Sequence, residues 1–323
     1  MLCLILFSMY GITDRKRQYN ILTDKHRRLI LRNERIKEMN IYEIITEKII
    51  ERVEAMIENG ETANWLCPWQ RLGLPKSYIS EKAYSGINLW LLESGYYLTW
   101  NQYLDIKKKN PDVNLKKGSK SHLCVYFNYN EVENEETGET KKVPYLKYYR
   151  LFESGDFENL PPKDKLIDYE HGEHADIDDF MSAYAKNADV RITVKKSDKA
   201  YYSPLFDEIV IPQPSMYPDF NNYVAVLAHE IIHSSGSKKR LDRIKDDFCE
   251  EETYSKEELI AQLGSSLLCF LLGYDTAETV NNDVNYIRGW LSHLKDNTRE
   301  LVSAAAKAQQ AVDYVMNTVN MGK

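Results

Sequence analysis

The stretch Tyr223-Val224-Ala225-Val226-Leu227-Ala228-His229-Glu230-Ile231-Ile232-His233 decides how the second half of this chain folds. Two histidines four residues apart lie on one face of a helix, about one turn from each other, so both imidazoles can ligate one metal ion. Glu230 stands beside them, as in an H-E-x-x-H zinc site. The apolar residues around them predict a buried helix that ends at Gly236. Unpaired polar groups on such a helix cost about 1–3 kcal/mol each, which favours a metal site over a chance match.

A third ligand is needed, because catalytic zinc normally takes three protein ligands and leaves the fourth position for water. We expect Glu258, on a second helix predicted from Ser255 onward, to reach a metal held by the first helix. Ser255-x-x-Glu258 also fits a helix-capping box, and Glu257 and Asp246 are alternatives. The expected Zn²⁺ site consists of His229, His233 and Glu258 as ligands, with Glu230 as the base.

The expected chemistry is hydrolysis of a peptide bond. Zn²⁺ lowers the pKa of water toward neutrality, and Glu230 would take the proton and pass it to the leaving amine. A strand predicted at residues 208–211 could pair with an extended peptide, or could be an ordinary core strand. Tyr286 and His293 are candidates for stabilising the transition state, although packing between helices is the favoured explanation for both.

The length and net charge of the chain limit its possible architecture and function. With 323 residues, two domains can each bury a core. A net charge of -7 excludes a protein coated in nucleic-acid-binding charge, so a nucleic-acid role must be regional. Five scattered cysteines without a C-x-x-C pair indicate free thiols in a reducing, cytoplasmic setting. The apolar start at residues 1–7 lacks a basic flank and is too short to span a membrane, so no membrane role is expected.

Three segments are predicted along the chain. Residues 1–39 form a basic, loosely ordered extension, residues 40–160 a first domain and residues 161–323 a second, because Pro161-Pro162 among charged neighbours is poor core and good linker. Periodicity predicts helices at 41–57, 177–184, 255–272, 285–293 and 301–319, strands at 122–127, 145–151 and 190–194, and a hairpin over 200–212. A further helix is expected to begin at Trp100.

Aromatic and lysine side chains are interleaved in the first domain. Aromatic faces can stack on unpaired bases while lysines follow the phosphates, although each aromatic taken alone is more often a core residue. The residues concerned are Trp65, Trp69, Tyr84, Trp90, Tyr96, Tyr97, Trp100 and Tyr103, with Lys76, Lys107, Lys108, Lys109, Lys116, Lys117 and Lys120.

Several motifs in order resemble the ArdC-type antirestriction proteins of plasmids and phages, a family also found fused to primases. The resemblance covers about residues 42–315. In the first domain it rests on Trp65-x-x-Pro68-Trp69, Tyr84-Ser85-Gly86-Ile87-Asn88, Trp100-Asn101-Gln102 and Lys117-Gly118-Ser119-Lys120. In the second it rests on residues 200–204 and 209–212, His229 to Gly236, Arg240 to Arg243, Glu257 to Gly264, and Tyr286-Ile287-x-x-Trp290-Leu291.

The resemblance implies an α+β chain: a mixed α/β domain that binds single-stranded DNA, then a zincin-like metallopeptidase domain with several helices and a small sheet that has an antiparallel edge. The family is implicated in protecting incoming DNA from restriction. Two departures are Gln262, where an acid is usual, and Ser237, where histidine is frequent. The implied DNA contacts are Trp65, Trp69, Tyr84, Asn88, Trp100, Gln102, Lys116, Lys117 and Lys120.

The preferred hypothesis is therefore an antirestriction-type protein of a mobile element that binds single-stranded DNA and carries a zinc peptidase site. The alternative is a DNA-binding shield whose zinc is structural and which cuts no peptide. An open ligand position distinguishes them, because structural zinc sites are closed by four protein ligands. The peptide substrate and the oligomeric state are left open by the sequence.

Overall fold

The computed structural model describes residues 39–60, 73–133, 140–164, 166, 176–244, 251–275 and 284–321. The basic extension predicted for residues 1–39 therefore lies almost wholly outside the described residues, as do Trp65, Trp69 and Asp246. The chain divides into two units, residues 1–44 and 45–323. Within the described ranges, no helix combines the length and the apolar character needed to cross a bilayer.

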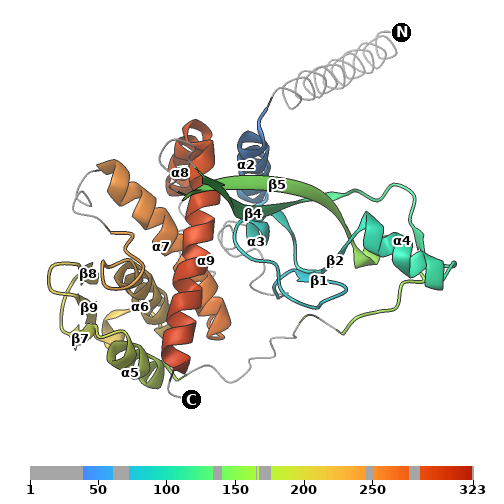
Figure 1. Cartoon of the computed structure of the whole chain (residues 1–323). Coiled ribbons are helices and arrows are strands. Elements are labelled where there is room, and N and C mark those ends of the chain that lie inside the picture. Colours follow the sequence, from blue (N-terminus) through green and yellow to red (C-terminus); the bar gives the residue numbers. More distant parts are fainter. Residues whose placement is uncertain are drawn as a thin grey trace, which may run out of the picture. The chain divides into compact units, whose positions relative to one another are not determined.

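The first half of the second unit is built on a four-stranded sheet with strand order β1-β2-β5-β4. Strands β4 and β5 form a long antiparallel ribbon that pairs His122 with Leu151 and Glu133 with Thr140 (Figure 1). Strand β2 pairs with β5 antiparallel and with β1 in parallel. The elements between residues 41 and 158 are α2 (Ile41–Glu58), β1 (Lys76–Ser77), α3 (Asn88–Leu91), β2 (Tyr96–Thr99), α4 (Trp100–Lys109), β3 (Asn114–Leu115), β4 (His122–Glu133), β5 (Thr140–Glu153), η2 (Ser154–Asp156) and β6 (Phe157–Glu158).

Two apolar clusters lie beside this sheet. One gathers Leu98, Tyr103 and Phe157, and the other gathers Tyr97, Cys124 and Leu151. Adjacent residues Tyr97 and Leu98 fall into different clusters because successive side chains of a strand point to opposite faces. The predicted helices at 41–57 and after Trp100 and the predicted ribbon strands are confirmed, whereas the short strands β1, β2, β3 and β6 were not predicted.

The second half carries a three-stranded sheet and a group of helices. Its elements are α5 (Ile177–Asn187), β7 (Arg191–Lys195), β8 (Tyr201–Ser203), β9 (Glu208–Pro212), η3 (Pro214–Met216), α6 (Phe220–Ser235), α7 (Glu251–Leu271), α8 (Val284–Asp296) and α9 (Thr298–Asn320). The strand order is β7-β9-β8, with β9 parallel to β7 and antiparallel to β8. The predicted hairpin and the antiparallel edge are thus confirmed.

The structure decides between the two alternatives for residues 208–211 in favour of an ordinary core strand. Strand β9, which contains residues 208–211, lies between β7 and β8, so both of its edges are already paired and it cannot accept a peptide. A single sequence cannot place a strand within its sheet, because an apolar run of this length fits a central strand and an edge strand equally well. Strands β7 and β8 are the edges instead.

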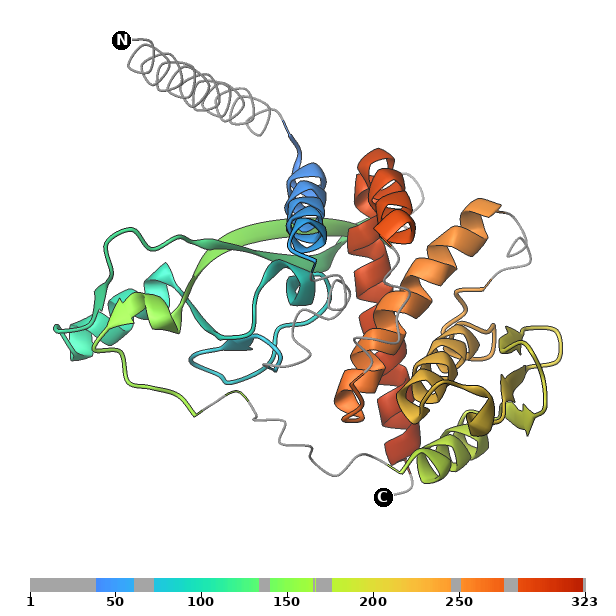
Figure 2. The same ribbon diagram turned by 180° about the vertical axis from the view of Figure 1, so that it is seen from behind.

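Helix α6 is held between the sheet and α7. Asp219 begins the helix by accepting a hydrogen bond from the backbone N–H of Asn222 at 2.8 Å, which satisfies one of the free donors of the first turn. Helix α6 contacts β8, β9, α7 and α9. Helix α9 lies alongside α7 in both views (Figures 1 and 2). The metal-ligating residues predicted on α6 and α7 are therefore carried by two packed helices.

Candidate metal centre

Three side chains from α6 and α7 converge on one point. His229, His233 and Glu258 offer ligand atoms that all lie within 4.8 Å of one another. The Nε2 atoms of His229 and His233 are 3.0 Å apart. Glu258 Oε2 lies 3.5 Å from His229 Nε2, and Oε1 lies 3.3 Å from His233 Nε2. Helical spacing accounts for the paired imidazoles, and the packing of α7 on α6 supplies the carboxylate.

The donor set fits a divalent cation. Two nitrogens that each lie ~2.1 Å from one tetrahedral ion stand ~3.4 Å apart, and the two Nε2 atoms of this site are 3.0 Å apart. Two imidazoles and one carboxylate are a known ligand set of catalytic zinc, with a fourth position left for water. The His229 and Glu258 side chains are 18% and 23% exposed, whereas that of His233 is 8% exposed.

Glu257 supports the site from behind His233. Its Oε1 lies 3.6 Å from His233 Nδ1, too far for a hydrogen bond but close enough for an ionic contact. Arg243 holds the same carboxylate, with Nη2 at 2.7 Å from Oε1 and Nε at 3.3 Å from Oε2. Burial opposes ionisation of Glu257, but His233 and Arg243 outweigh it and lower its pKa. Of the two adjacent glutamates, the arrangement favours Glu258 as ligand and Glu257 as the group that orients His233.

Glu230 lies at the junction of α6 and the sheet. Its side chain is buried, and burial raises its pKa although His229 and His233 lower it. The backbone N–H of Tyr202 on β8 lies close to Glu230 and also lowers its pKa. A carboxyl group whose pKa is raised toward neutrality is suited to accept and return a proton. The edge of β8 therefore faces the residue predicted as the base.

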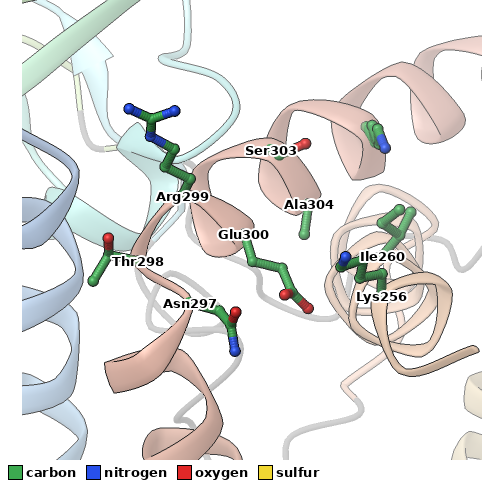
Figure 3. A pocket seen from close by; sticks show the side chains of 9 residues that line it. Lys256, Ile260, Asn297, Thr298, Arg299, Glu300, Ser303 and Ala304 are labelled. Carbon is green, nitrogen blue, oxygen red and sulfur yellow. The ribbon is translucent and has the colours of Figure 1, made fainter. Parts of the chain in front are cut away.

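A cavity of 540 Å³ lies elsewhere, at the start of α9. It is lined by Lys256, Ile260, Asn297, Thr298, Arg299, Glu300, Ser303, Ala304 and Lys307. Figure 3 shows Glu300 pointing toward Lys256 and Ile260, and Arg299 pointing away from them. Lys256 and Ile260 each lie two residues from Glu258, which places them on the opposite side of α7 from the metal-facing carboxylate. The cavity is therefore separate from the metal centre.

The implied DNA contacts on the first domain fall into two groups. Trp100 is 47% exposed and packs in a tilted arrangement against Tyr103 at 4.9 Å and Phe152 at 5.8 Å, measured between ring centroids. Lys117 and Lys120 are also exposed, and the Lys116 ammonium donates to the carbonyl of Gly155 at 2.7 Å. These side chains are placed where a nucleic acid can reach them.

The other implied contacts have structural partners. The Asn88 amide is buried and exchanges two hydrogen bonds of 2.8 Å with the backbone of Val125 on β4. Gln102 forms a reciprocal capping box with Thr99 at the start of α4. Tyr84 meets the buried Tyr97 ring edge-on at 6.3 Å. Their hydrogen bonds and packing account for these residues without DNA, so their role in DNA binding stays a prediction.

Exposed aromatics on the β4–β5 ribbon were missed by the sequence reasoning. Tyr126, Tyr148 and Tyr149 are 50%, 59% and 36% exposed, and Arg150 beside them is also exposed. The run Lys147-Tyr148-Tyr149-Arg150 within a predicted strand was a usable signal, because strand alternation presents a cation and a ring on each face.

The structure also places His293, one of the two candidates for transition-state stabilisation, and Gln262, which departs from the family pattern. His293 Nε2 lies 3.1 Å from Glu300 Oε1 at the start of α9, in agreement with a packing role. The Tyr286 side chain lies outside the described residues. Gln262 lies on α7 one turn after Glu258, and the acid that faces the outer nitrogen of His233 is Glu257.

Both halves of the chain are similar to known proteins. Residues 178–307 match a family model described as zincin-like metallopeptidase, and residues 39–152 match the N-terminal domain of anti-restriction factor ArdC. The metal-free crystal structure of antirestriction ArdC protein from R388 plasmid shares 31% identity over 87% of this chain and 98% of that one, with a TM-score of 0.64. Its Mn(II)-bound structure shares 29% identity over 88% and 100% of the two chains, with a TM-score of 0.65.

Two sequence relatives extend the comparison. Protein y4eC of Sinorhizobium fredii (strain NBRC 101917 / NGR234) is 27% identical over 85% of this chain and 91% of its own length. DNA primase TraC of Escherichia coli is 26% identical over 95% of this chain, which spans only 22% of the primase. With both halves matched and a solved relative above 30% identity along nearly its whole length, this chain belongs to the ArdC antirestriction family.

Proposed function

We propose that this antirestriction protein binds single-stranded DNA through its first domain and hydrolyses peptide bonds at a zinc site formed by His229, His233 and Glu258, with Glu230 as base. The observation that carries the peptidase proposal is the convergence of the three ligand atoms within 4.8 Å. Glu230 lies on the same helix, beside the edge of the sheet. The exposure of His229 and Glu258 supports an open site rather than a closed structural one.

The residues divide the chemistry among them. A bound divalent cation supplies a Lewis acid that polarises a carbonyl group and lowers the pKa of water. Glu230 accepts the proton of the attacking water and returns it to the leaving amine, for which its raised pKa is suited. Glu257 and Arg243 hold His233 in one orientation.

Strand β8 is the proposed docking edge for the peptide. Tyr201 and Ser203 pair with Val210 and Glu208 on β9. Tyr202 lies between them, opposite Ile209, and its N–H is close enough to Glu230 to lower the pKa of that carboxyl group, so we take this N–H to lie on the outer edge of β8. An extended peptide added along this outer edge would run past the base. Strand β8 thus takes the role that the sequence suggested for β9.

Metal content tests the ligand set. Zinc stoichiometry measured by atomic emission should fall from one to near zero in His229→Ala, His233→Ala and Glu258→Ala. Glu300→Ala is the matched control, because Glu300 is a mostly buried glutamate that contacts a histidine outside this cluster. Unchanged zinc in all three ligand variants would refute the site.

Hydrolysis tests the base. Glu230→Gln should bind zinc as well as the native protein does and lose cleavage of an unfolded protein such as casein. Proteolysis retained by this variant would contradict the assignment of Glu230. Full zinc binding with no cleavage even by the native protein would favour the alternative, a DNA-binding shield with a structural metal.

Salt dependence tests the DNA proposal. Affinity for a labelled single-stranded oligonucleotide should fall steeply with salt, because lysine–phosphate contacts release counterions. Lys117→Ala with Lys120→Ala should reduce the slope by about one to two units of log Kd per log salt, since each lysine–phosphate pair contributes ~0.7. Lys196→Ala with Lys199→Ala, two exposed lysines of the second half, is the control pair. An affinity indifferent to salt would count against DNA binding.

A further inference from the structure

The turn between β8 and β9 exposes two large apolar side chains. Leu205 and Phe206 are 83% and 68% exposed, and Leu205 is the most exposed large apolar residue among those that the structure describes. Tyr201, at the start of β8, is 44% exposed. Single exposed apolar residues are common on protein surfaces, but two adjacent ones at the tip of a hairpin indicate a contact point.

The hairpin is firmly held, so this exposure does not come from a loose loop. Asp207 follows the tip and accepts hydrogen bonds from Arg240 and, at 2.9 Å, from the Tyr202 hydroxyl. The Arg240 side chain is 2% exposed, and its Nε donates to the carbonyl of Ser234 near the end of α6 at 2.7 Å. The base of the tip is thereby anchored to the helix that carries Glu230.

The tip is also close to the proposed site of hydrolysis. Leu205 follows Tyr202, whose N–H lies close to Glu230, by three residues. At a rise of about 3.3 Å per residue, the tip lies within ~10 Å along the chain from that contact. A peptide extended along β8 covers this distance with about three residues.

The two edges of the small sheet differ in charge. Edge strand β7 carries Arg191 and Lys195, and Lys196 follows it. Charged side chains on an edge discourage pairing with another strand. The segment 201–206, which comprises β8 and the tip, contains no charged residue. Only the edge that faces Glu230 is therefore left suitable for pairing with a peptide.

We propose that Leu205 and Phe206 dock a large apolar side chain of an extended polypeptide substrate paired with β8, so that the site selects apolar residues within about three positions of the cleaved bond. The inference rests on the proposed peptidase function and adds the substrate class to it. The occupant is an unfolded or extended polypeptide, because a folded surface does not offer a free strand to the outer edge of β8.

Binding tests the tip without hydrolysis. In zinc-loaded Glu230→Gln protein, fluorescein-labelled casein should bind at least tenfold more weakly once Leu205→Ser and Phe206→Ser are added. The matched control adds Ile79→Ser and Met321→Ser, which remove two exposed apolar side chains elsewhere, 53% and 78% exposed, and should leave affinity within twofold. Equal affinity with and without the tip substitutions, an equal loss in the control, or no binding in any variant overturns the proposal.

Cleavage gives the second readout. Sites cut by the native zinc-loaded protein in a proteome-derived peptide library, mapped by mass spectrometry, should be enriched in Leu, Phe, Met and Ile within three positions. Leu205→Ser with Phe206→Ser should abolish that enrichment. Cleavage with no apolar preference overturns this inference and leaves the peptidase proposal standing. Tip-dependent casein binding without any cleavage overturns the peptidase proposal and leaves the docking of an apolar side chain at the tip standing.

A lipid surface is the competing partner for two exposed apolar residues. Flotation with phosphatidylglycerol vesicles distinguishes it. Vesicle binding that is lost with the tip substitutions, together with casein binding that is unchanged by them, would replace the polypeptide with a membrane and overturn the proposal.

Discussion

At the scale of single residues, the proposed metal centre has charged groups behind its ligands that we expect to matter as much as the ligands. Glu257 faces the outer nitrogen of His233 and is itself held by Arg243. Both side chains of this carboxylate–guanidinium pair are 6% exposed, so water has little access to either charged group. In the proposed site, this pair sets which nitrogen of His233 is directed toward the metal position.

Removing the charge of Glu257 should weaken metal binding without removing a ligand. We expect Glu257→Gln to lower zinc affinity about 10- to 100-fold, as for other groups that orient a ligating histidine. Competition with a chelator dye measures this affinity. Glu300→Gln is the matched control, since Glu300 also contacts a histidine and its side chain is 8% exposed. An affinity unchanged in Glu257→Gln would show that Glu257 does not orient His233.

The pKa of His233 makes metal binding depend on pH. Burial favours the neutral imidazole, but contacts with Glu257 and Glu258 outweigh it and raise the pKa of His233 to about 9 in the metal-free protein. The imidazole is therefore protonated below about pH 9 and must lose that proton to ligate a metal. Zinc affinity should rise with pH, by up to about tenfold per unit, and level off near the pKa of about 9.

Calorimetry measures directly whether zinc binding releases this proton. Zinc binding at about pH 7.5, measured in buffers of different ionisation enthalpy, should release about one proton per metal, the proton of His233. In His233→Ala, which should bind almost no zinc, addition of zinc should release no such proton. A release near zero in the native protein would mean that His233 is neutral before metal binds, against the raised pKa.

At the scale of elements, the distance between α6 and α7 sets the ligand geometry. Gly264 on α7 faces Ile232 on α6, and a Cβ at position 264 would lie 3.0 Å from Ile232 Cγ2. Ile232 is fully buried, so it has little room to move away. The absence of a side chain at Gly264 lets the two helices approach at the turn before His233, which brings Glu258 within reach of the imidazoles.

Gly264→Ala tests this close approach. Alanine has the better helix propensity by about 1 kcal/mol, but overpacking in a filled core costs about 1–3 kcal/mol. We therefore expect no gain or a net loss of up to about 2 kcal/mol in the free energy of unfolding, with weaker zinc binding. Gly289→Ala is the control, because nothing lies within 4 Å of its added Cβ, and it should be stabilising. Equal stabilisation by both substitutions in denaturant titrations would rule out the tight contact.

At the scale of the whole molecule, the metal would join two helices that also pack on a third. Ligands on α6 and α7 come from segments separated by the residues between Ser235 and Glu251, and both helices contact α9. A metal that binds only the folded arrangement stabilises it by mass action, so the linkage between zinc and unfolding should be large.

Thermal unfolding measures this linkage. Free zinc at about 100 times its Kd should add about 2.7 kcal/mol to the free energy of unfolding, and EDTA should remove that increment. The melting temperature of Glu258→Ala should not respond to zinc at the same concentration. A native protein that melts at one temperature with zinc and with EDTA would show that the cluster does not bind the metal in the folded state.

Whether an element could be predicted from the sequence depends on whether the interactions that form it are local or join distant segments. The helices at 41–57, 255–272 and 301–319 were predictable because an apolar period of 3.6 residues is a local property. Trp100 could be placed on a helix in the same way, but the adjacent Tyr96–Thr99 strand could not be predicted, because its partners on β5 are more than fifty residues away in the sequence. The exposed tyrosines of the ribbon were missed because exposure depends on the final fold.

The sequence by itself determined the helix with two imidazoles and a carboxylate one residue away, since i, i+4 spacing fixes their common face wherever that helix is placed. Only the tertiary structure decided that Glu258 meets these imidazoles while Glu257 turns to Arg243, because adjacent residues of a helix point about 100° apart and packing selects which one faces inward. It also decided that β8 rather than β9 has the open edge, since strand order depends on hydrogen bonds between distant segments.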